Sequence, residues 1–242
     1  MSKKEKIRIE NTINKALNED YEELKNYFIS KHLYSEEIDK NVKEYFKKSH
    51  KAIYLLGLWS HHFNFETTYR KIFLEEIRSD AIQSLQLSLL NLKRPVSLLI
   101  RSIIENLLKH IFYYDHIIEF ERSEKEEQYY QSMDNLWSYL KNHPRLDLYE
   151  NTDVIGRLQT EYSILSRYVH SKSSKHMSLT TSLEDLSFND EYFKKYCTQI
   201  NNISIYVNFI LINFYNLYLD TFEPPWKYLI LNILSKELRS KI

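Results

Sequence analysis

Glycine is almost absent from this chain, and this scarcity restricts the possible folds more than any other feature of the sequence. Only Gly57 and Gly156 occur among 242 residues, whereas glycine ordinarily makes up about 7% of a protein. Folds with many strands need tight turns, and many of those turns need glycine. Proline is also rare, with four residues in the whole chain. We therefore expect an all-α fold in which long helices are joined by short connections.

The residue content also excludes several classes of site. Phosphate-binding loops and dinucleotide fingerprints need several glycines at fixed spacing, which this sequence does not have. The single cysteine, Cys197, excludes a disulfide framework and a cysteine-based zinc site. The zinc-protease pattern HExxH is absent too, and His62 and Glu66 are the pair whose spacing suits metal binding best. We expect no metal and no cofactor.

Charge and hydropathy are those of an ordinary folded protein. Lys and Arg together number 33, as do Asp and Glu, so the overall field does not favour nucleic acid, although a local basic patch stays open. Hydrophobic residues make up 43% of the chain, which is enough for a core. The basic N-terminus lacks the apolar segment of a signal peptide. No apolar run reaches the roughly 18 residues of a membrane span, so we expect a cytoplasmic protein without membrane contact.

Apolar periodicity divides the chain into a series of amphipathic helices. The expected helices cover residues 3–29, 36–48, 50–63, 66–92, 95–120, 123–142, 151–171, 189–221 and 226–240. The first part of the chain is more polar than the rest. We expect residues 1–48 to form an N-terminal helical arm and residues 49–242 to form one helical bundle domain.

Arg101, Glu105 and Lys109 form a polar row on the expected helix at 95–120. Their spacing of four places them one above another, along the margin of the apolar stripe. One interpretation is an ordinary ladder of ion pairs, each worth about 0.2–0.5 kcal/mol. The other is that the charges are partly buried and paired, because charges are not buried without a partner.

Tyr162, Ser166 and His170 form a second polar row, on the expected helix at 151–171. Arg167 points elsewhere, more than about 90° from Tyr162 at 100° per residue. His170 lies near the end of this helix, where the helix dipole favours a protonated imidazole. A structural histidine that caps the helix is the alternative interpretation.

The segment RSIIENLLKH, followed some sixty residues later by YSILSRYVHS, resembles the HEPN superfamily, and in particular its prokaryotic members. The pattern is an Arg-x-x-x-Glu helix and a later Tyr-x-x-Leu-Ser-x-x-x-His helix. The residues that carry it are Arg101, Glu105, Tyr162, Leu165, Ser166 and His170. The resemblance covers about residues 80–215. It implies an up-and-down helical bundle, often dimeric, to which this chain would add extra N-terminal helices.

The resemblance also implies a metal-independent ribonuclease, or a toxin-type effector, in antiviral defence by abortive infection. Such enzymes carry an arginine followed four to six residues later by a histidine, and this chain has no such pair. We therefore expect a composite site assembled from different helices. Its expected catalytic residues are Arg101, Glu105 and His170, and its expected substrate-binding residues are Lys109, Tyr162, Ser166 and Lys172.

In this hypothesis His170 is a general acid or base, and Arg101 stabilises negative charge on the phosphate. Glu105 either orients Arg101 or raises the pKa of His170. Tyr162 and Ser166 either bind the phosphate or hold the other side chains in place. The expected partners are RNA or a nucleotide, together with a second copy of the chain or a partner protein of a defence system. The alternative is a non-catalytic helical module that binds a partner protein or a nucleotide in a defence or toxin–antitoxin system. The first hypothesis requires Arg101, Glu105 and His170 to converge.

Overall fold

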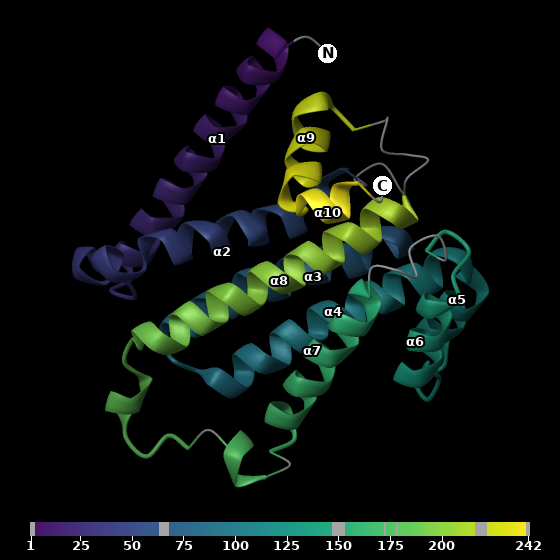
Figure 1. The fold of residues 1–242 in the computed structure, drawn as a ribbon. Coiled ribbons are helices and arrows are strands. Elements are labelled where there is room, and N and C mark those ends of the chain that lie inside the picture. The colour runs from purple at the N-terminus through teal and green to yellow at the C-terminus, as the bar shows by residue number, and fades with distance from the viewer. Residues whose placement is uncertain are drawn as a thin grey trace.

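The computed structural model is built of helices, some joined by short turns and two by a longer irregular connection (Figure 1). It describes residues 3–62, 68–146, 153–171, 173–177, 179–215 and 222–240. The α-helices are α1 (Lys3–Ser30), α2 (Glu36–His62), α3 (Thr68–Leu89), α4 (Lys93–Asp115), α5 (Ile117–Lys125), α6 (Met133–Lys141), α7 (Val154–Val169), α8 (Asp190–Phe214), α9 (Pro224–Ile233) and α10 (Lys236–Arg239). Two 3-10 turns, η3 (Ser174–His176) and η4 (Leu183–Leu186), lie between α7 and α8. No strand occurs in these ranges, so the all-α prediction is confirmed.

The bundle is built from α2, α3, α4, α7 and α8. Helix α3 packs against both α2 and α4, α8 packs along α2, and α7 packs on α4. Figure 1 shows α5 and α6 beyond one end of α4, while α1, α9 and α10 lie around α2. One hydrophobic core extends through all of these layers, from Ile13 in α1 to Leu234 after α9.

The connection between α3 and α4 places the candidate site helix. Asn91 adopts a left-handed backbone conformation, with φ of 54°, which asparagine tolerates better than most residues. The chain therefore reverses within three residues, and α4 returns along α3. Pro95 occupies the first turn of α4, where its missing N–H costs no hydrogen bond.

Helix α2 joins two helices that we expected to be separate. The sequence pattern predicted residues 36–48 and 50–63, whereas α2 runs without a break from Glu36 to His62. The junction contains no helix-breaking residue, and the Ser49 hydroxyl bonds within the helix, donating to the Phe46 carbonyl at 2.9 Å. Ser35 caps α2 as expected, since its oxygen accepts from the Ile38 N–H at 3.2 Å. The division into arm and bundle at residue 48 falls inside this helix and stays a prediction.

Helix α4 ends earlier than expected because of His116. We predicted a helix to about residue 120, but α4 stops at Asp115 and α5 begins after one residue. The His116 ring stacks on Phe112 at 4.3 Å and its Nδ1 donates to the Phe112 carbonyl at 2.9 Å. This local bond turns the chain, which apolar periodicity does not reveal.

Two further expected helices are divided in the structure. The segment 123–142 contains the end of α5 and then α6, which starts where the Ser132 oxygen accepts from the Asn135 N–H. The segment 226–240 is divided into α9 and α10, with Ser235 capping α10. In both places a serine provides a new helix start. The expected helix at 189–221 is α8 up to Phe214, and residues 216–221 lie outside the described ranges.

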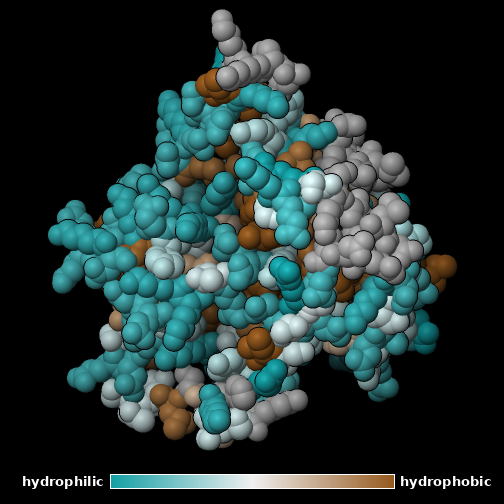
Figure 2. Space-filling view, in the orientation of Figure 1, coloured by the Kyte–Doolittle hydropathy of each residue, from teal (hydrophilic) through white to brown (hydrophobic). Residues whose placement is uncertain are grey.

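The face shown in Figure 2 is mostly hydrophilic, with apolar side chains in separate small areas. The large apolar side chains instead fill the interior, where Trp59, Phe46 and Phe193 are fully buried. Within the described ranges, no helix combines the length and apolar character that crossing a membrane requires.

Candidate functional site

Four of the expected site residues meet where α7 packs on α4. The Nε of Arg101 donates to Glu105 Oε1 at 2.8 Å, and its Nη1 donates to His170 Nε2 at 3.0 Å. The Tyr162 hydroxyl donates to the same Glu105 oxygen at 3.0 Å. Two helices that are distant in the sequence thus build one connected network, which we call the Arg101 network: Arg101, Glu105, Tyr162 and His170.

The Arg101 network lies at the boundary between core and solvent. The side chains of Arg101 and Glu105 are 17% and 24% exposed. The Arg101 guanidinium carbon lies 5.1 Å from the centre of the Tyr162 ring, which shields one side of the cation. His170 is exposed at the end of α7. The charges are therefore partly buried and paired, as the second of our two interpretations expected, and they are open to a ligand on the His170 side.

The bond between Arg101 and His170 defines the state of the imidazole. A guanidinium carries only donors, so His170 Nε2 must be the acceptor and cannot carry a proton. The tautomer that fits this hydrogen bond has its proton on Nδ1. A hydroxyl that replaces the Arg101 N–H at Nε2 would meet a nitrogen able to take its proton.

Tyr162 is held as a donor. Burial and the Glu105 carboxylate raise the pKa of Tyr162, and the Arg101 cation opposes them only in part. The phenol therefore stays protonated at neutral pH and continues to donate to Glu105. The sequence left two roles open for Tyr162, and its hydroxyl here holds another side chain of the site.

The remaining expected residues lie apart from the network. Ser166 is on the same row of α7, but its Oγ is buried and has no hydrogen-bond partner within the described part of the chain. Lys109 is half-buried on α4, about 12 Å along the helix axis from Arg101. Arg167 is exposed, in agreement with the helical wheel. Lys172 lies outside the described residues.

Arg94 is a neighbour of the site that we did not expect from the sequence. Its Nε donates to the Val169 carbonyl at 3.1 Å, next to His170. This bond satisfies one of the carbonyls that a helix leaves unpaired at its C-terminus, and it fixes the end of α7 to the start of α4. The only signal in the sequence is the spacing of seven between Arg94 and Arg101, which places both on one side of a helix.

Asp80 in α3 was missed as well. Asp80 is 3% exposed, and its carboxylate accepts from Asn106 Nδ2 at 3.4 Å. Burial raises the pKa of Asp80, with hydrogen bonds from Ser102 and Asn106 acting against it and the nearby Glu105 carboxylate adding to it. This buried acid therefore lies behind the Arg101 network. No spacing within α3 or α4 could reveal it, because the contact depends on how the two helices pack.

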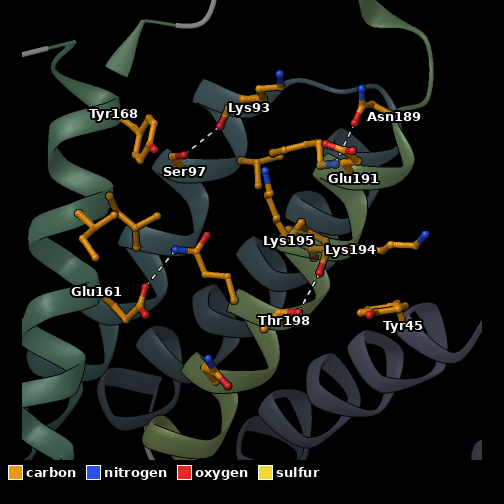
Figure 3. Close-up of a pocket in the computed structure, with 17 residues that line it drawn as sticks. Tyr45, Lys93, Ser97, Glu161, Tyr168, Asn189, Glu191, Lys194, Lys195 and Thr198 are labelled. Carbon is orange, nitrogen blue, oxygen red and sulfur yellow. Dashed lines mark hydrogen bonds between the residues drawn. The ribbon is translucent and has the colours of Figure 1, made fainter. Parts of the chain in front are cut away.

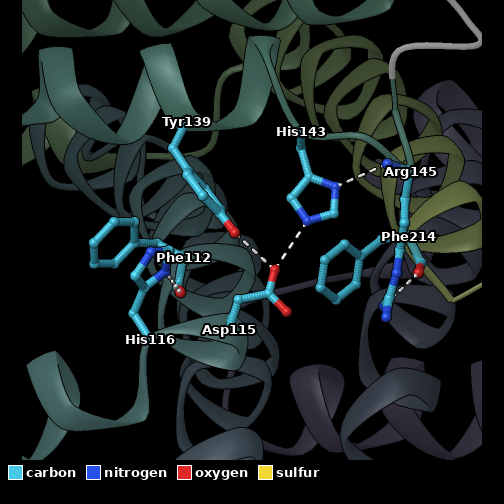
Figure 4. Close-up of polar contacts among 7 residues, drawn as sticks. All are labelled: Phe112, Asp115, His116, Tyr139, His143, Arg145 and Phe214. Atoms are coloured by element: carbon cyan, nitrogen blue, oxygen red, sulfur yellow. Dashed lines mark hydrogen bonds and ion pairs between the residues drawn. The ribbon is translucent and has the colours of Figure 1, made fainter.

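A second polar cluster joins the ends of α4 and α6 (Figure 4). Asp115 Oδ2 accepts from the Tyr139 hydroxyl at 2.7 Å and from His143 Nε2 at 2.9 Å. His143 Nδ1 accepts from the Arg145 N–H at 3.2 Å, and Arg145 Nη1 donates to the Phe214 carbonyl at 3.2 Å. The His143 side chain is only 4% exposed. These bonds all close within the protein, which indicates a structural connection between α4, α6 and α8.

Within the described ranges, no three His, Cys, Asp or Glu side chains are grouped so that they could hold a metal ion. Comparison with protein-family models, with curated proteins and with solved structures finds no match to this chain. The likeness to HEPN proteins therefore rests on the motif residues quoted above. It stays a hypothesis, and the Arg101 network is the geometry on which a function can be argued.

Proposed function

We propose that this chain is a HEPN-like, metal-independent ribonuclease that acts as a toxin-type effector in antiviral defence. The observation that carries the proposal is the 3.0 Å bond between Arg101 and His170, two residues 69 apart in the sequence. In it, an imidazole nitrogen that accepts a hydrogen bond lies beside a cation at the protein surface. A proton acceptor next to a phosphate-binding cation is the minimum that cleavage of RNA by its own 2′-hydroxyl requires.

The reaction follows from the roles of these two side chains. A ribose 2′-hydroxyl first replaces the Arg101 N–H at His170 Nε2. Nε2 then takes the proton of this hydroxyl, and the resulting oxygen attacks the adjacent phosphorus. The bond from phosphorus to the 5′-oxygen breaks, and the imidazolium or water protonates that oxygen. The products are a 2′,3′-cyclic phosphate and a 5′-hydroxyl, and no metal is needed.

Arg101 balances the negative charge that gathers on the phosphate. Its bond to Glu105 uses one of the five N–H groups of a guanidinium, so the N–H released from His170 and the remaining ones can donate to phosphate oxygens. Glu105 fixes the direction of the guanidinium, and the Tyr162 ring limits its motion. A cation that is oriented in advance stabilises the transition state without reorganising.

A non-catalytic module is the second candidate. It is favoured by the fact that Arg101 occupies the Nε2 lone pair of His170, and by the lack of a closely spaced Arg–His pair in the sequence. In that case the same network would bind an RNA or nucleotide phosphate, or a partner protein, without chemistry. Binding that persists without any cleavage by the wild-type chain would favour this candidate.

The test uses the purified chain with a labelled single-stranded RNA in the presence of EDTA. We expect cleavage by the wild type, and its loss in Arg101→Ala and in His170→Ala. Arg167→Ala is the matched control, because Arg167 is exposed on the same helix and outside the network; it should keep full activity. Far-UV circular dichroism must show that all three variants are helical. Cleavage that survives in both network variants contradicts the proposal.

A further inference from the structure

An open cleft with a volume of about 910 Å³ lies along a different side of α7 from the Arg101 network. Figure 3 shows its walls: Tyr168 and Glu161 project from α7, Lys195 from α8, and Lys93 from the start of α4. The Arg101 network does not use any of these side chains. The cleft is thus a second feature of the same pair of helices, α4 and α7.

The cleft is lined by groups that suit a nucleic-acid backbone. Three lysines and two glutamates line it, and Lys93 and Lys195 are both exposed. No carboxylate of the described residues forms an ion pair with Lys195. An exposed ammonium without an internal partner attracts phosphate by charge and requires no particular sequence.

The same cleft carries groups that suit an unpaired base. The Tyr168 side chain is 42% exposed, and an accessible aromatic ring is a stacking surface for any base. Gln199 Nε2 donates to Glu161 Oε2 at 3.1 Å, so a carboxylate and an amide lie together on facing walls. These two groups are able to bond to base edges, as a carboxylate accepts from the amino group of cytosine and an amide pairs with adenine.

The cleft and the Arg101 network share one end of α7. Tyr168 precedes His170 by two residues, and Lys93 precedes Arg94, which binds the Val169 carbonyl. A helix with its side chains is only about 10–12 Å across, so a strand that crosses the end of α7 reaches both places. We propose that the cleft binds the single-stranded RNA segment next to the phosphate held by Arg101. This inference rests on the proposed function and names the form of its substrate.

The test measures binding to the full-length wild-type chain by fluorescence anisotropy. The probe is a labelled single-stranded RNA with 2′-O-methyl groups, which cannot be cleaved by 2′-hydroxyl attack. Lys195→Glu should raise the Kd at least tenfold and make the Kd less dependent on salt, because a backbone contact is lost. Tyr168→Ala should raise the Kd about fivefold or more at every salt concentration, because stacking is lost. Lys125→Glu, on the exposed surface of α5, is the control and should leave the Kd unchanged.

A duplex of the same sequence provides the second arm of the test. It should bind at least tenfold more weakly than the single strand, because its bases are not available to Tyr168. Equal binding of duplex and single strand overturns the inference, as does an unchanged Kd in both cleft variants. Cleavage is measured separately. Both proposals are retained if Arg101→Ala loses cleavage and the cleft variants weaken RNA binding as expected. If the wild-type chain binds RNA at the cleft but never cleaves it, only the proposal of ribonuclease activity is overturned.

Discussion

At the scale of single residues, one carboxylate oxygen of Glu105 accepts two hydrogen bonds. Oε1 accepts from both Arg101 and Tyr162, so the phenol acts on the cation through the carboxylate. The helical wheel predicted that Tyr162 and His170 share a row while Arg167 does not, because such angles are a local property of a helix. It could not predict Arg94 or Asp80, whose contacts depend on the packing of separate helices.

Tyr162→Phe tests the role of this phenol. The variant keeps the ring over Arg101 and loses the bond to Glu105. A hydrogen bond to a charged group is worth about 1.5 kcal/mol, so RNA cleavage should fall by about tenfold. The readout is kcat on single-stranded RNA. Tyr130→Phe is the control, since Tyr130 is 80% exposed, and equal rates in the two variants would contradict a positioning role.

Asp80→Asn tests whether the buried carboxylate of Asp80 destabilises the folded state. Burial raises the pKa of Asp80, so folding favours its protonated form, and ionisation destabilises the folded state as the pH rises. The neutral asparagine retains an oxygen that can accept from Asn106. Asp80→Asn should therefore melt at a higher temperature than the wild type at pH 7, and the difference should shrink below about pH 4. Thermal unfolding at both pH values measures this, and a lower melting temperature at pH 7 would contradict it.

At the scale of helices, periodicity predicted where helices occur better than where they end. The expected helix at 3–29 matches α1, and the expected helix at 151–171 contains α7. The break after Asp115 was missed because the His116 ring folds back on Phe112, and the break near residue 48 was wrong because nothing there disrupts α2. Each difference comes from a side-chain bond or its absence, which the average hydropathy of a segment does not contain.

Asp115→Ala tests the connection between α4 and α6. Burial acts to raise the pKa of Asp115, but bonds from Tyr139 and His143 outweigh it and hold that pKa below its ordinary value. The ionised carboxylate therefore stabilises the fold above about pH 4, and this stabilisation is lost as the pH falls through the lowered folded pKa. Loss of hydrogen bonds worth about 1.5 kcal/mol should lower Tm by about 3–6 °C at pH 7.

The difference in Tm between Asp115→Ala and the wild type should be smaller at pH 3 than at pH 7. At pH 3 protonation of Asp115 weakens the same hydrogen bonds in the wild-type protein. Glu127→Ala is the control, because Glu127 is exposed near the end of α5. A constant difference from pH 7 to pH 3 would show that the ionised carboxylate does not stabilise this connection.

At the scale of the whole molecule, the arm and the bundle share one core. The aromatic rings of Tyr21 and Tyr34 pack on Phe46 at 5.2 and 5.0 Å, and Phe46 is fully buried. His50 Nε2 lies 2.6 Å from Asp20 Oδ2, which joins α2 to α1 within the segment where we placed the boundary. The polar composition of the first 48 residues suggested separability, but composition does not show that Ile13, Tyr21 and Phe28 of α1 are buried in the common core.

We therefore predict that the described helices unfold as one cooperative unit, and Tyr21→Ala tests this. Tyr21 is 2% exposed, and truncation of a buried aromatic residue costs about 3–5 kcal/mol. The variant should show a single calorimetric transition whose midpoint temperature is lower than that of the wild type by about 6–20 °C. Tyr27→Ala is the control on the same helix, since Tyr27 is 50% exposed, and it should shift the transition by far less. A separable arm would instead give two calorimetric transitions, and Tyr21→Ala would lower the midpoint temperature of only one of them. RNA cleavage would then survive removal of residues 1–48.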